Sequence, residues 1–189
     1  MVKKLSTNGV AGFVLANGSL ATNNKQEYAI RKKMIEDRGG IVDCIIAMPT
    51  NLFSTVAIPV ALWFIRKGRT NMGKTLFIDC RNKGVMIDRK TRELTQEEIA
   101  EIAGTYHKWL KGEGYGDIKG YCKSATIEEI AATDYSLVPG RYVGIDDSNK
   151  LSEEEVKAEI IKVKQELRDL FAKNAELDQK ILAILDSED

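Results

Sequence analysis

The sequence has few of the residues that usually build metal and redox centres. Its 189 residues include one histidine, His107, and three widely spaced cysteines, Cys44, Cys80 and Cys122, with no Cys-x-x-Cys pair. A zinc site needs clustered ligands at short spacings, so no metal centre is expected. The odd number of cysteines, with Cys44 and Cys80 inside expected strands, indicates buried free thiols in a reducing cytoplasm.

Long hydrophobic runs are lacking as well. No stretch of 18 or more apolar residues occurs, so no helix is expected to cross a membrane. The basic start, MVKKLSTNG, leads into an apolar run at Val10–Ala16 that is too short for a signal peptide and has no suitable cleavage site. We therefore expect a cytoplasmic location.

Acidic and basic residues balance overall but not locally. Residues 1–92 contain 16 Lys and Arg against 6 Asp and Glu, whereas residues 93–189 contain 12 against 22. The excess of basic residues is greatest between Arg66 and Arg92. Such a one-sided segment can bind nucleic-acid phosphates through counterion release, and the alternative is a solvated hairpin that the acidic half neutralises. The candidates for contacts with a DNA backbone are Arg66, Lys67, Arg69 and Lys74.

Two apolar runs, Ile41–Met48 and Ile58–Ile65, organise the rest of the chain. Each is short and rich in Val and Ile, which predicts strands that are buried on both faces. The polar loop Thr50–Ala57 then follows the carboxyl end of a strand, where open α/β sheets place their ligand sites.

Further elements are expected on either side of these runs. Val10–Ala16 predicts a first buried strand, and Lys25–Arg38 predicts a helix capped by a residue of Thr22–Asn24. Together with the Ile41 strand they predict a β-α-β unit with a right-handed parallel crossover. A short strand, Leu76–Cys80, follows a short polar loop, which favours antiparallel pairing with the strand before it.

The second half of the chain is predicted to be mainly helical. Thr95 and Glu98 form a capping box that opens one helix, and Thr126 opens a shorter one. Ser152 caps a helix that should run to about Leu185. Apolar residues recur in it at alternating spacings of four and three, which favours a partner helix over packing on its own domain. The seam residues, one of them polar, are Val156, Ile160, Val163, Leu167, Leu170, Asn174, Leu177, Ile181 and Ile184.

One segment matches a nucleotide-binding loop by pattern alone. Gly68–Thr75 reads G-x-x-x-x-G-K-T, but phosphate binding needs a helix that starts at Lys74. The residues Thr75–Cys80 have a strand-like pattern instead, so we interpret the match as chance. No G-x-S-x-G elbow and no G-x-G-x-x-G loop after a strand occurs. The residues of this chain therefore predict no complete active site.

Seven sequence blocks are more informative together than any single motif. In chain order they are GVAGFVLANGSL, IRKKMIE, VDCIIAMPTNLFSTVAIPVALWFIRK, LFIDCR, RELTQEEIAEIAGTYHKW, GYCKSATIEEI and DYSLVPGRYVG. They resemble the carboxyl-terminal half of type I restriction–modification methyltransferase subunits, which are N6-adenine DNA methylases. The resemblance covers about Gly9 to Gly144 and continues in a similar helical tail. It implies an α/β fold, the C-terminal part of a Rossmann-like sheet that is mixed with an antiparallel last strand, followed by a helical region and a long C-terminal helix.

The resemblance also implies what is missing. In this family S-adenosylmethionine is bound on the early strands of the Rossmann-like domain, and a catalytic Asn-Pro-Pro-aromatic motif precedes the segment that matches Val10–Ala16. The sequence has no Pro-Pro pair, since its prolines are Pro49, Pro59 and Pro139. We therefore expect an amino-terminally truncated methylase that binds no cofactor by itself, with S-adenosylmethionine used by the complete enzyme.

Carried over residue by residue, the loop Pro49–Pro59 corresponds to a late family motif beside the target-adenine pocket. Asn51 and Phe53 are therefore candidate pocket residues, and Phe53 would stack on an extruded base. The family often has a second aromatic residue at the next position, where this chain has Ser54, so core packing is the alternative for Phe53. Asn17 matches a strand-end loop near the cofactor side, and a simple turn is its alternative.

The helical tail resembles the family region that docks against helices of the DNA-specificity subunit. The implied function is that of a truncated adenine methylase subunit, inactive alone, which contacts specificity and restriction subunits and reaches DNA through their complex. The alternative is a non-catalytic interaction module that binds a specificity subunit or self-associates through the tail or an open strand edge. We expect three parts: residues 1–92 from the α/β domain, 93–145 as a helical and loop region, and 146–189 as the heptad helix.

Overall fold

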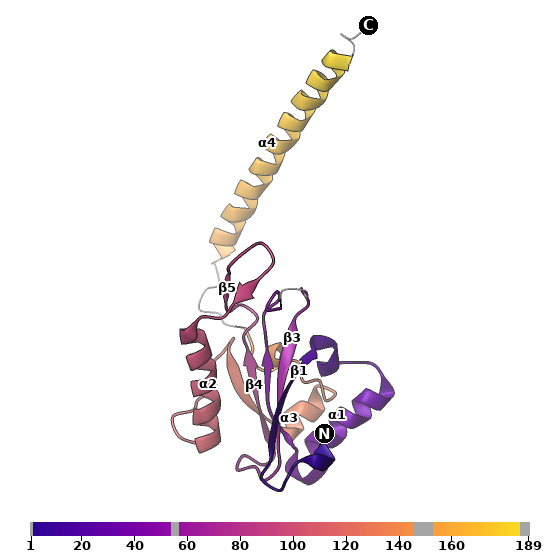
Figure 1. Cartoon of the computed structure of the whole chain (residues 1–189). Coiled ribbons are helices and arrows are strands. Elements are labelled where there is room, and N and C mark those ends of the chain that lie inside the picture. The colour runs from indigo at the N-terminus through magenta and orange to yellow at the C-terminus, as the bar shows by residue number, and fades with distance from the viewer. Residues whose placement is uncertain (1, 54–56, 146–152, 186–189) are drawn as a thin grey trace. The chain divides into compact units, whose positions relative to one another are not determined.

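The computed structural model describes residues 2–53, 57–145 and 153–185, and Figure 1 shows the arrangement of the elements within each part. The chain forms two compact units, Met1–Asp146 and Asp147–Asp189. The first is an α/β unit, and the second contains one long helix. The expected division into three parts stays a prediction.

Five strands form the main sheet of the α/β unit. They are β1 (Val10–Ala16), β2 (Val42–Ala47), β3 (Val60–Arg66), β4 (Lys74–Asp79) and β7 (Cys122–Thr126). Their order is β1-β3-β2-β4-β7; β2 and β4 are parallel, and the other neighbours are antiparallel. In register, Trp63 lies opposite both Phe13 of β1 and Ile45 of β2. A separate two-stranded sheet pairs β5 (Val85–Met86) with β6 (Arg92–Glu93).

The sheet confirms the predicted strand positions and corrects their pairing. β1 and β2 run in the same direction, as the β-α-β prediction requires, but β3 lies between them. The expected antiparallel pairing of β3 with β4 is wrong. Both edges of β3 are occupied by β1 and β2, so β4 crosses to the far edge of β2 and pairs with it in parallel. Because β4 begins at Lys74, that residue starts a strand and not the helix of a phosphate-binding loop.

Burial differs sharply between the strands. β2 is buried along its whole length, as predicted. β1 was expected to be buried but is largely exposed, with Val10 and Val14 45% and 47% exposed. Its position at the end of the strand order accounts for this difference. β7 was not predicted, because its sequence, CKSAT, is mostly polar and only half-buried.

Helices cover the two faces of the sheet unequally. α1 (Lys25–Glu36) and α3 (Ile127–Ala132) lie on one face, and α2 (Gln96–Lys111) lies on the other (Figure 1). The predicted caps are confirmed: the side chains of Asn24, Thr95 and Thr126 each accept a hydrogen bond from the first turn. Short 3-10 turns are η1 (Val2–Lys4), η2 (Asn17–Leu20), η3 (Asp37–Gly39) and η4 (Pro139–Arg141).

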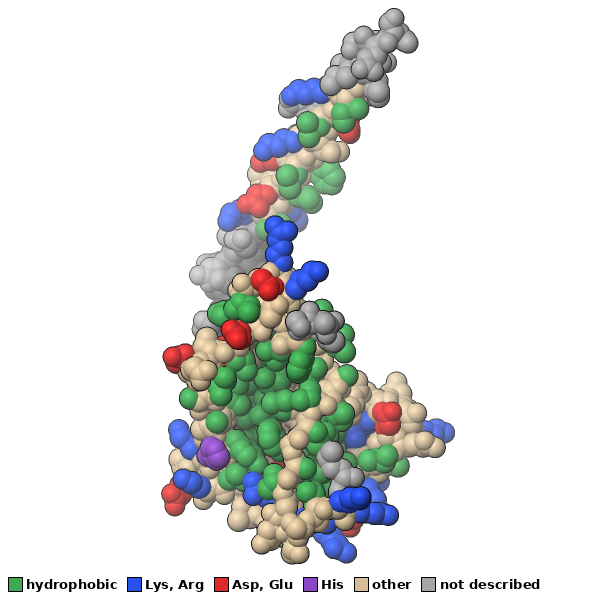
Figure 2. Space-filling model, in the orientation of Figure 1, with side chains coloured by type: hydrophobic (Ala, Val, Ile, Leu, Met, Phe, Trp, Pro, Cys, Tyr) green, Lys and Arg blue, Asp and Glu red, His purple; other side chains and the backbone are tan. Residues whose placement is uncertain are grey.

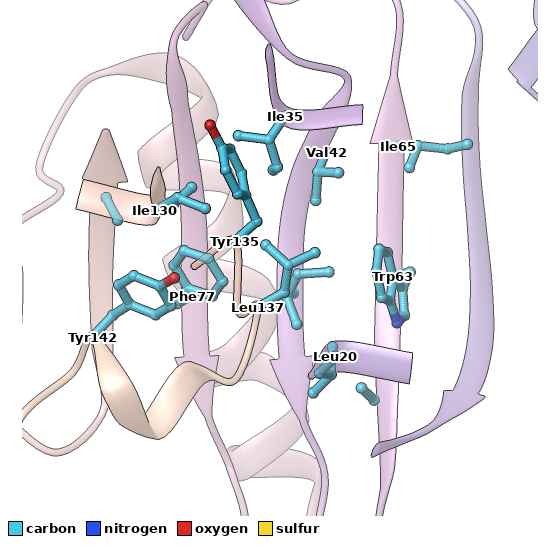
Figure 3. Close-up of a cluster of buried hydrophobic side chains, with 13 residues drawn as sticks. Leu20, Ile35, Val42, Trp63, Ile65, Phe77, Ile130, Tyr135, Leu137 and Tyr142 are labelled. Atoms are coloured by element: carbon cyan, nitrogen blue, oxygen red, sulfur yellow. The ribbon is translucent and has the colours of Figure 1, made fainter. Parts of the chain in front are cut away.

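Each face of the sheet carries its own apolar cluster. On the α1 and α3 face, Phe77 stacks on Tyr142 with ring centroids 4.0 Å apart, and Leu137 and Ile130 pack nearby (Figure 3). On the α2 face, the buried cluster includes all three free cysteines. Burial of this kind is the main stabilising contribution to folding.

The second unit contains α4 (Glu153–Leu185), a helix of 33 residues. All of its described side chains are exposed. The predicted cap, Ser152, and the side chains of the seam residues Val156 and Ile184 lie outside the described residues. Within the described parts of the chain, none of the helices has the length and apolar character that crossing a membrane requires.

Candidate functional site

The three residues expected in a base pocket follow the carboxyl ends of β1 and β2. Asn17 opens η2 directly after β1, and its backbone N–H donates to the carbonyl of Pro59 at 3.4 Å. Asn51 lies in the loop after β2, and its carbonyl accepts a hydrogen bond of 2.7 Å from the N–H of Arg92. These contacts tie η2, the β2–β3 loop and β6 into one edge of the unit.

The side chains at this edge differ in their exposure. Phe53 is 47% exposed and belongs to neither apolar cluster, so the core-packing alternative has no support. Asn51 has a positive φ of 65°, a left-handed conformation that asparagine tolerates better than most residues. The side-chain carbonyl oxygen of Asn17 is buried and has no hydrogen-bond partner among the described residues. Ser54 lies outside the described residues.

The four candidate DNA-backbone residues lie at the opposite end of the sheet, and three of them have internal partners. Arg66 and Arg69 each place Nε 3.1 Å from a different carboxylate oxygen of Asp43. Lys67 donates from Nζ to the carbonyl of Leu5 at 2.7 Å. Lys74, at the start of β4, has an exposed side chain. The assignment of this set to DNA phosphates stays a prediction, and the geometry favours Lys74.

Asp43 is the centre of a buried polar network that the sequence analysis missed. It is 1% exposed, and besides the two arginines it accepts a hydrogen bond of 2.6 Å from the Tyr106 hydroxyl. Burial and the Asp43 carboxylate raise the pKa of Tyr106, and burial lowers the pKa of Arg69. The signal was an aspartate inside an apolar strand, because a buried charge needs partners. This network fixes the amino-terminal end of β2 against the β3–β4 connection and α2.

A polar cavity of about 700 Å³ lies at the carboxyl end of β4. Its acids are already paired: Asp79 with Arg81 at 2.6 Å, and Glu101 with Lys83 at 2.6 Å. A Cβ at Gly140 would come within 2.6 Å of Arg81 Nη2, the end of a flexible and half-exposed side chain, which would have to shift. The lining is therefore cationic or neutralised.

The β1–β3 half of the sheet has an uncovered apolar face on the α2 side. Val14 of β1 lies opposite Leu62 of β3, and Gly12 lies opposite Phe64. Leu62 and Phe64 are only partly buried, and they line a hollow of about 300 Å³ between β3 and α2. Figure 2 shows hydrophobic side chains gathered over this face of the α/β unit. Since β1 pairs only with β3 in the described chain, its outer edge is also open.

The other face beside β1 is hollow too. A cavity of about 600 Å³ is lined by Phe13, Met34 and Trp63, and also by Arg31. Arg31 is 4% exposed and donates to the carbonyls of Tyr135 and Thr22, but its Nη1 has no partner among the described residues. The buried indole Nε1 of Trp63 likewise lacks one. Buried polar atoms are normally hydrogen-bonded to protein or to ordered water, so these two donors lack the partners that buried donors usually have.

Comparison with known proteins relates these features to a family. A family profile described as N-6 DNA Methylase matches residues 1–151. The chain is 40% identical to the "Type I restriction enzyme HindI methylase subunit" of Haemophilus influenzae, covering 96% of this chain and 40% of that protein. It is 41% identical to the "Type I restriction enzyme MjaIX methylase subunit" of Methanocaldococcus jannaschii, covering 95% of this chain and 32% of that protein.

Solved structures agree with these matches. The type I restriction-modification methyltransferase subunit of Streptococcus thermophilus superposes with a TM-score of 0.63 at 31% identity, over 73% of this chain and 27% of that one. The EcoKI M protein superposes with a TM-score of 0.60 at 14% identity, over 91% of this chain and 42% of that one, which shows a shared fold.

The fold thus defines a class, a mixed α/β sheet with helices that is similar to type I methyltransferase subunits. The chain belongs to the N-6 DNA methylase family. It spans about a third to two fifths of the length of the two curated relatives described above.

Proposed function

We propose that the chain supplies the late part of the catalytic domain of a type I DNA adenine methylase and is inactive alone. The complete enzyme would transfer a methyl group from S-adenosylmethionine to adenine N6. The Rossmann-like part of the domain would then continue the sheet at β1. We also place the protein in the cytoplasm, as one component of a complex with specificity and restriction subunits.

The observation that carries this proposal is the uncovered side of β1. Its outer edge is open, its α2-side face is apolar and exposed, and the opposite face borders a cavity with unpaired buried donors. A strand pairing with β1, flanked by helices on both faces, would satisfy all three. The relatives have the additional length that such elements require. Self-association of the isolated chain through this edge is the alternative to self-association through the tail.

The polar cavity at the end of β4 has few groups that fit S-adenosylmethionine. This cofactor carries a sulfonium cation, an ammonium group and a carboxylate, and its two cationic groups need free carboxylates or carbonyl oxygens. The polar cavity at the end of β4 is instead lined by Arg81, Lys83 and Lys119, and its acids Asp79 and Glu101 are paired. We therefore derive no step of methyl transfer from this chain's own residues, and we assign the cofactor to the remainder of the domain.

We assign the target-adenine side of the pocket to Asn17, Asn51 and Phe53. All three lie at the carboxyl edge of parallel strands, where α/β folds bind ligands. The exposed ring of Phe53 offers a stacking surface for an extruded base. Stacking on an aromatic side chain contributes roughly 1–3 kcal/mol, so Phe53→Ala should lower adenine methylation by the completed enzyme about 5- to 150-fold.

Complementation tests the proposal. The complementary polypeptide is the part of the Haemophilus influenzae methylase subunit that this chain does not match, and the two are co-expressed from separate genes. Calorimetry should detect no S-adenosylmethionine binding to the chain alone and saturable binding to the co-purified complex. Saturable one-to-one binding by the chain alone would overturn the assignment. A complex that forms but never methylates DNA would favour the alternative of a non-catalytic interaction module.

A further inference from the structure

The exposed apolar seam of α4 restricts which partner helix it can pair with. Its six described apolar members are between 48% and 62% exposed. Most helical stability in proteins comes from burial of an apolar face, and α4 leaves all of its described side chains exposed. The six are Ile160, Val163, Leu167, Leu170, Leu177 and Ile181.

The single polar seam residue restricts how two helices can pair. The spacing places Asn174 at heptad position a, together with Ile160, Leu167 and Ile181. In a parallel, in-register pair the a positions face each other, so Asn174 would meet the same residue of the other copy. Asn174 Nδ2 donates to Asp178 of the same helix at 3.4 Å, but in an antiparallel or shifted pair its side-chain oxygen would face an apolar residue and lack a partner across the seam. A single a-position Asn commonly specifies register and a two-stranded state.

Charges beside the seam favour the same arrangement. Lys173 is at position g and Asp178 at position e of the next heptad, and these positions face each other across a parallel dimer. Two symmetric attractive pairs would form. One heptad earlier, Glu166 at g would face Phe171 at e, which introduces no repulsion. Phe171 is 67% exposed and widens the apolar stripe on that side.

We propose that α4 pairs with α4 of a second copy of this chain as a parallel, in-register, two-stranded coiled coil. In the isolated chain the occupant of the seam is thus an identical helix, chosen by the self-complementary Asn174 and the Lys173–Asp178 pairs, in place of the specificity-subunit helices expected in the complete complex. This inference does not depend on the proposed methylase role, because it concerns the chain alone and a different unit.

Site-specific cross-linking tests the register. The native cysteines are all buried free thiols, so a new surface cysteine reports without competition from exposed ones. Under mild oxidation, Val163→Cys at a d position should give a reducible dimer of twice the chain mass. Gln165→Cys, at the outward f position, is the matched control and should remain uncross-linked. No cross-link at Val163→Cys, or equal cross-linking at both positions, overturns the proposal.

Measuring the mass of the full chain in solution distinguishes dimerisation through the α4 seam from association through the open edge of β1. Light scattering at micromolar concentration should give a dimer for the unmodified chain and a monomer for the double variant Leu170→Lys/Leu177→Lys. Gln165→Lys/Gln179→Lys carries the same charges at f positions and should stay dimeric. A monomeric unmodified chain, or a dimer that survives the seam substitutions, contradicts the proposal. Circular dichroism of the α/β unit is expected to be unchanged in every variant.

Discussion

The two halves of the sheet have similar apolar sequences and very different surroundings. β2 reads VDCIIA and is buried on both faces, whereas β1 reads VAGFVLA and is mostly exposed. α2 packs on one face of the β2–β4 half, and α1 and α3 cover the other. Beside β1, one face is uncovered and the other borders a cavity. The comparison teaches that composition marks a strand for burial, while the neighbouring elements decide whether burial occurs.

The largest expected effect comes from removing the buried charge of the covered half. Asp43→Ala leaves Arg69 buried without its carboxylate, and breaking a buried ion pair in this way costs roughly 3–5 kcal/mol. Urea denaturation of the variant measures the free energy of unfolding. Glu113→Ala, at an exposed position, is the control and should change it by less than about 0.5 kcal/mol. Equal stabilities would mean that Asp43 is not the centre of a network.

Truncation of one apolar side chain in each strand compares the two halves directly. Ile45→Ala in β2 should lower the free energy of unfolding by roughly 2–5 kcal/mol, because the side chain is fully buried. Val14→Ala in β1 should lower it by less than about 0.5 kcal/mol in the isolated chain. In the complex with the complementary polypeptide, Val14→Ala should become more costly. Similar losses of stability at both positions in the isolated chain would contradict the difference in burial between β2 and β1.

Alkaline pH should lower the free energy of unfolding through the buried thiols of the covered half. Burial raises the pKa of Cys44 and Cys122, and it raises that of Cys80 from 9.0 to about 12. Thiols of the unfolded chain ionise near pH 9 while the folded ones stay neutral. Stability is therefore nearly constant well below pH 9 and falls as the pH rises toward 12, and the Cys80 thiol contributes roughly 1 kcal/mol of the loss at pH 10.

A cysteine variant separates this effect from tyrosine ionisation. Thermal unfolding is measured between pH 8 and 10 for the unmodified chain and for Cys80→Ala. The variant should start less stable and lose less stability over this range. Parallel pH profiles for the two proteins would show that the Cys80 thiol makes no such contribution.

The smallest effect is expected at the start of α2. Thr95 and Glu98 cap each other, and Glu98 also accepts a hydrogen bond of 2.7 Å from the N–H of Gly84 in the turn before β5. Thr95→Ala should cost about 1 kcal/mol, the usual value for losing a capping side chain. Lys108→Ala, at an exposed position in the same helix, should be neutral. A neutral Thr95→Ala would show that packing alone positions α2.

Local sequence signals predicted the elements of this fold but not the pairing between strands that are distant in the sequence. The strands at Val10 and Ile41 and the capping boxes at Thr95 and Thr126 followed from nearby residues, and the structure confirms them. The insertion of β3 between β1 and β2 depends on contacts between distant segments. A polar strand such as β7 is stabilised by its neighbour, so its own sequence gave little signal.

The candidate site was likewise predictable where it depends on nearby residues and not where it depends on distant ones. The position of the β2–β3 loop at a strand end was predictable. The proximity of Asn17 to this loop followed from the prediction that β1 and β2 run in the same direction. The engagement of Arg66 and Arg69 was not, because Asp43 lies 23 and 26 residues before them and Tyr106 lies 63 after it. Charge counts along the sequence cannot distinguish a paired arginine from a free one.

Amide hydrogen exchange of β1 tests most directly whether its uncovered side is an interface within the methylase domain. The complex with the complementary polypeptide is compared with the chain alone, diluted below its self-association range. The account predicts fast exchange in the chain alone at the β1 amides that point away from β3, and strong protection of the same amides in the complex. Unchanged exchange of residues 10–16 in a purified complex would contradict it.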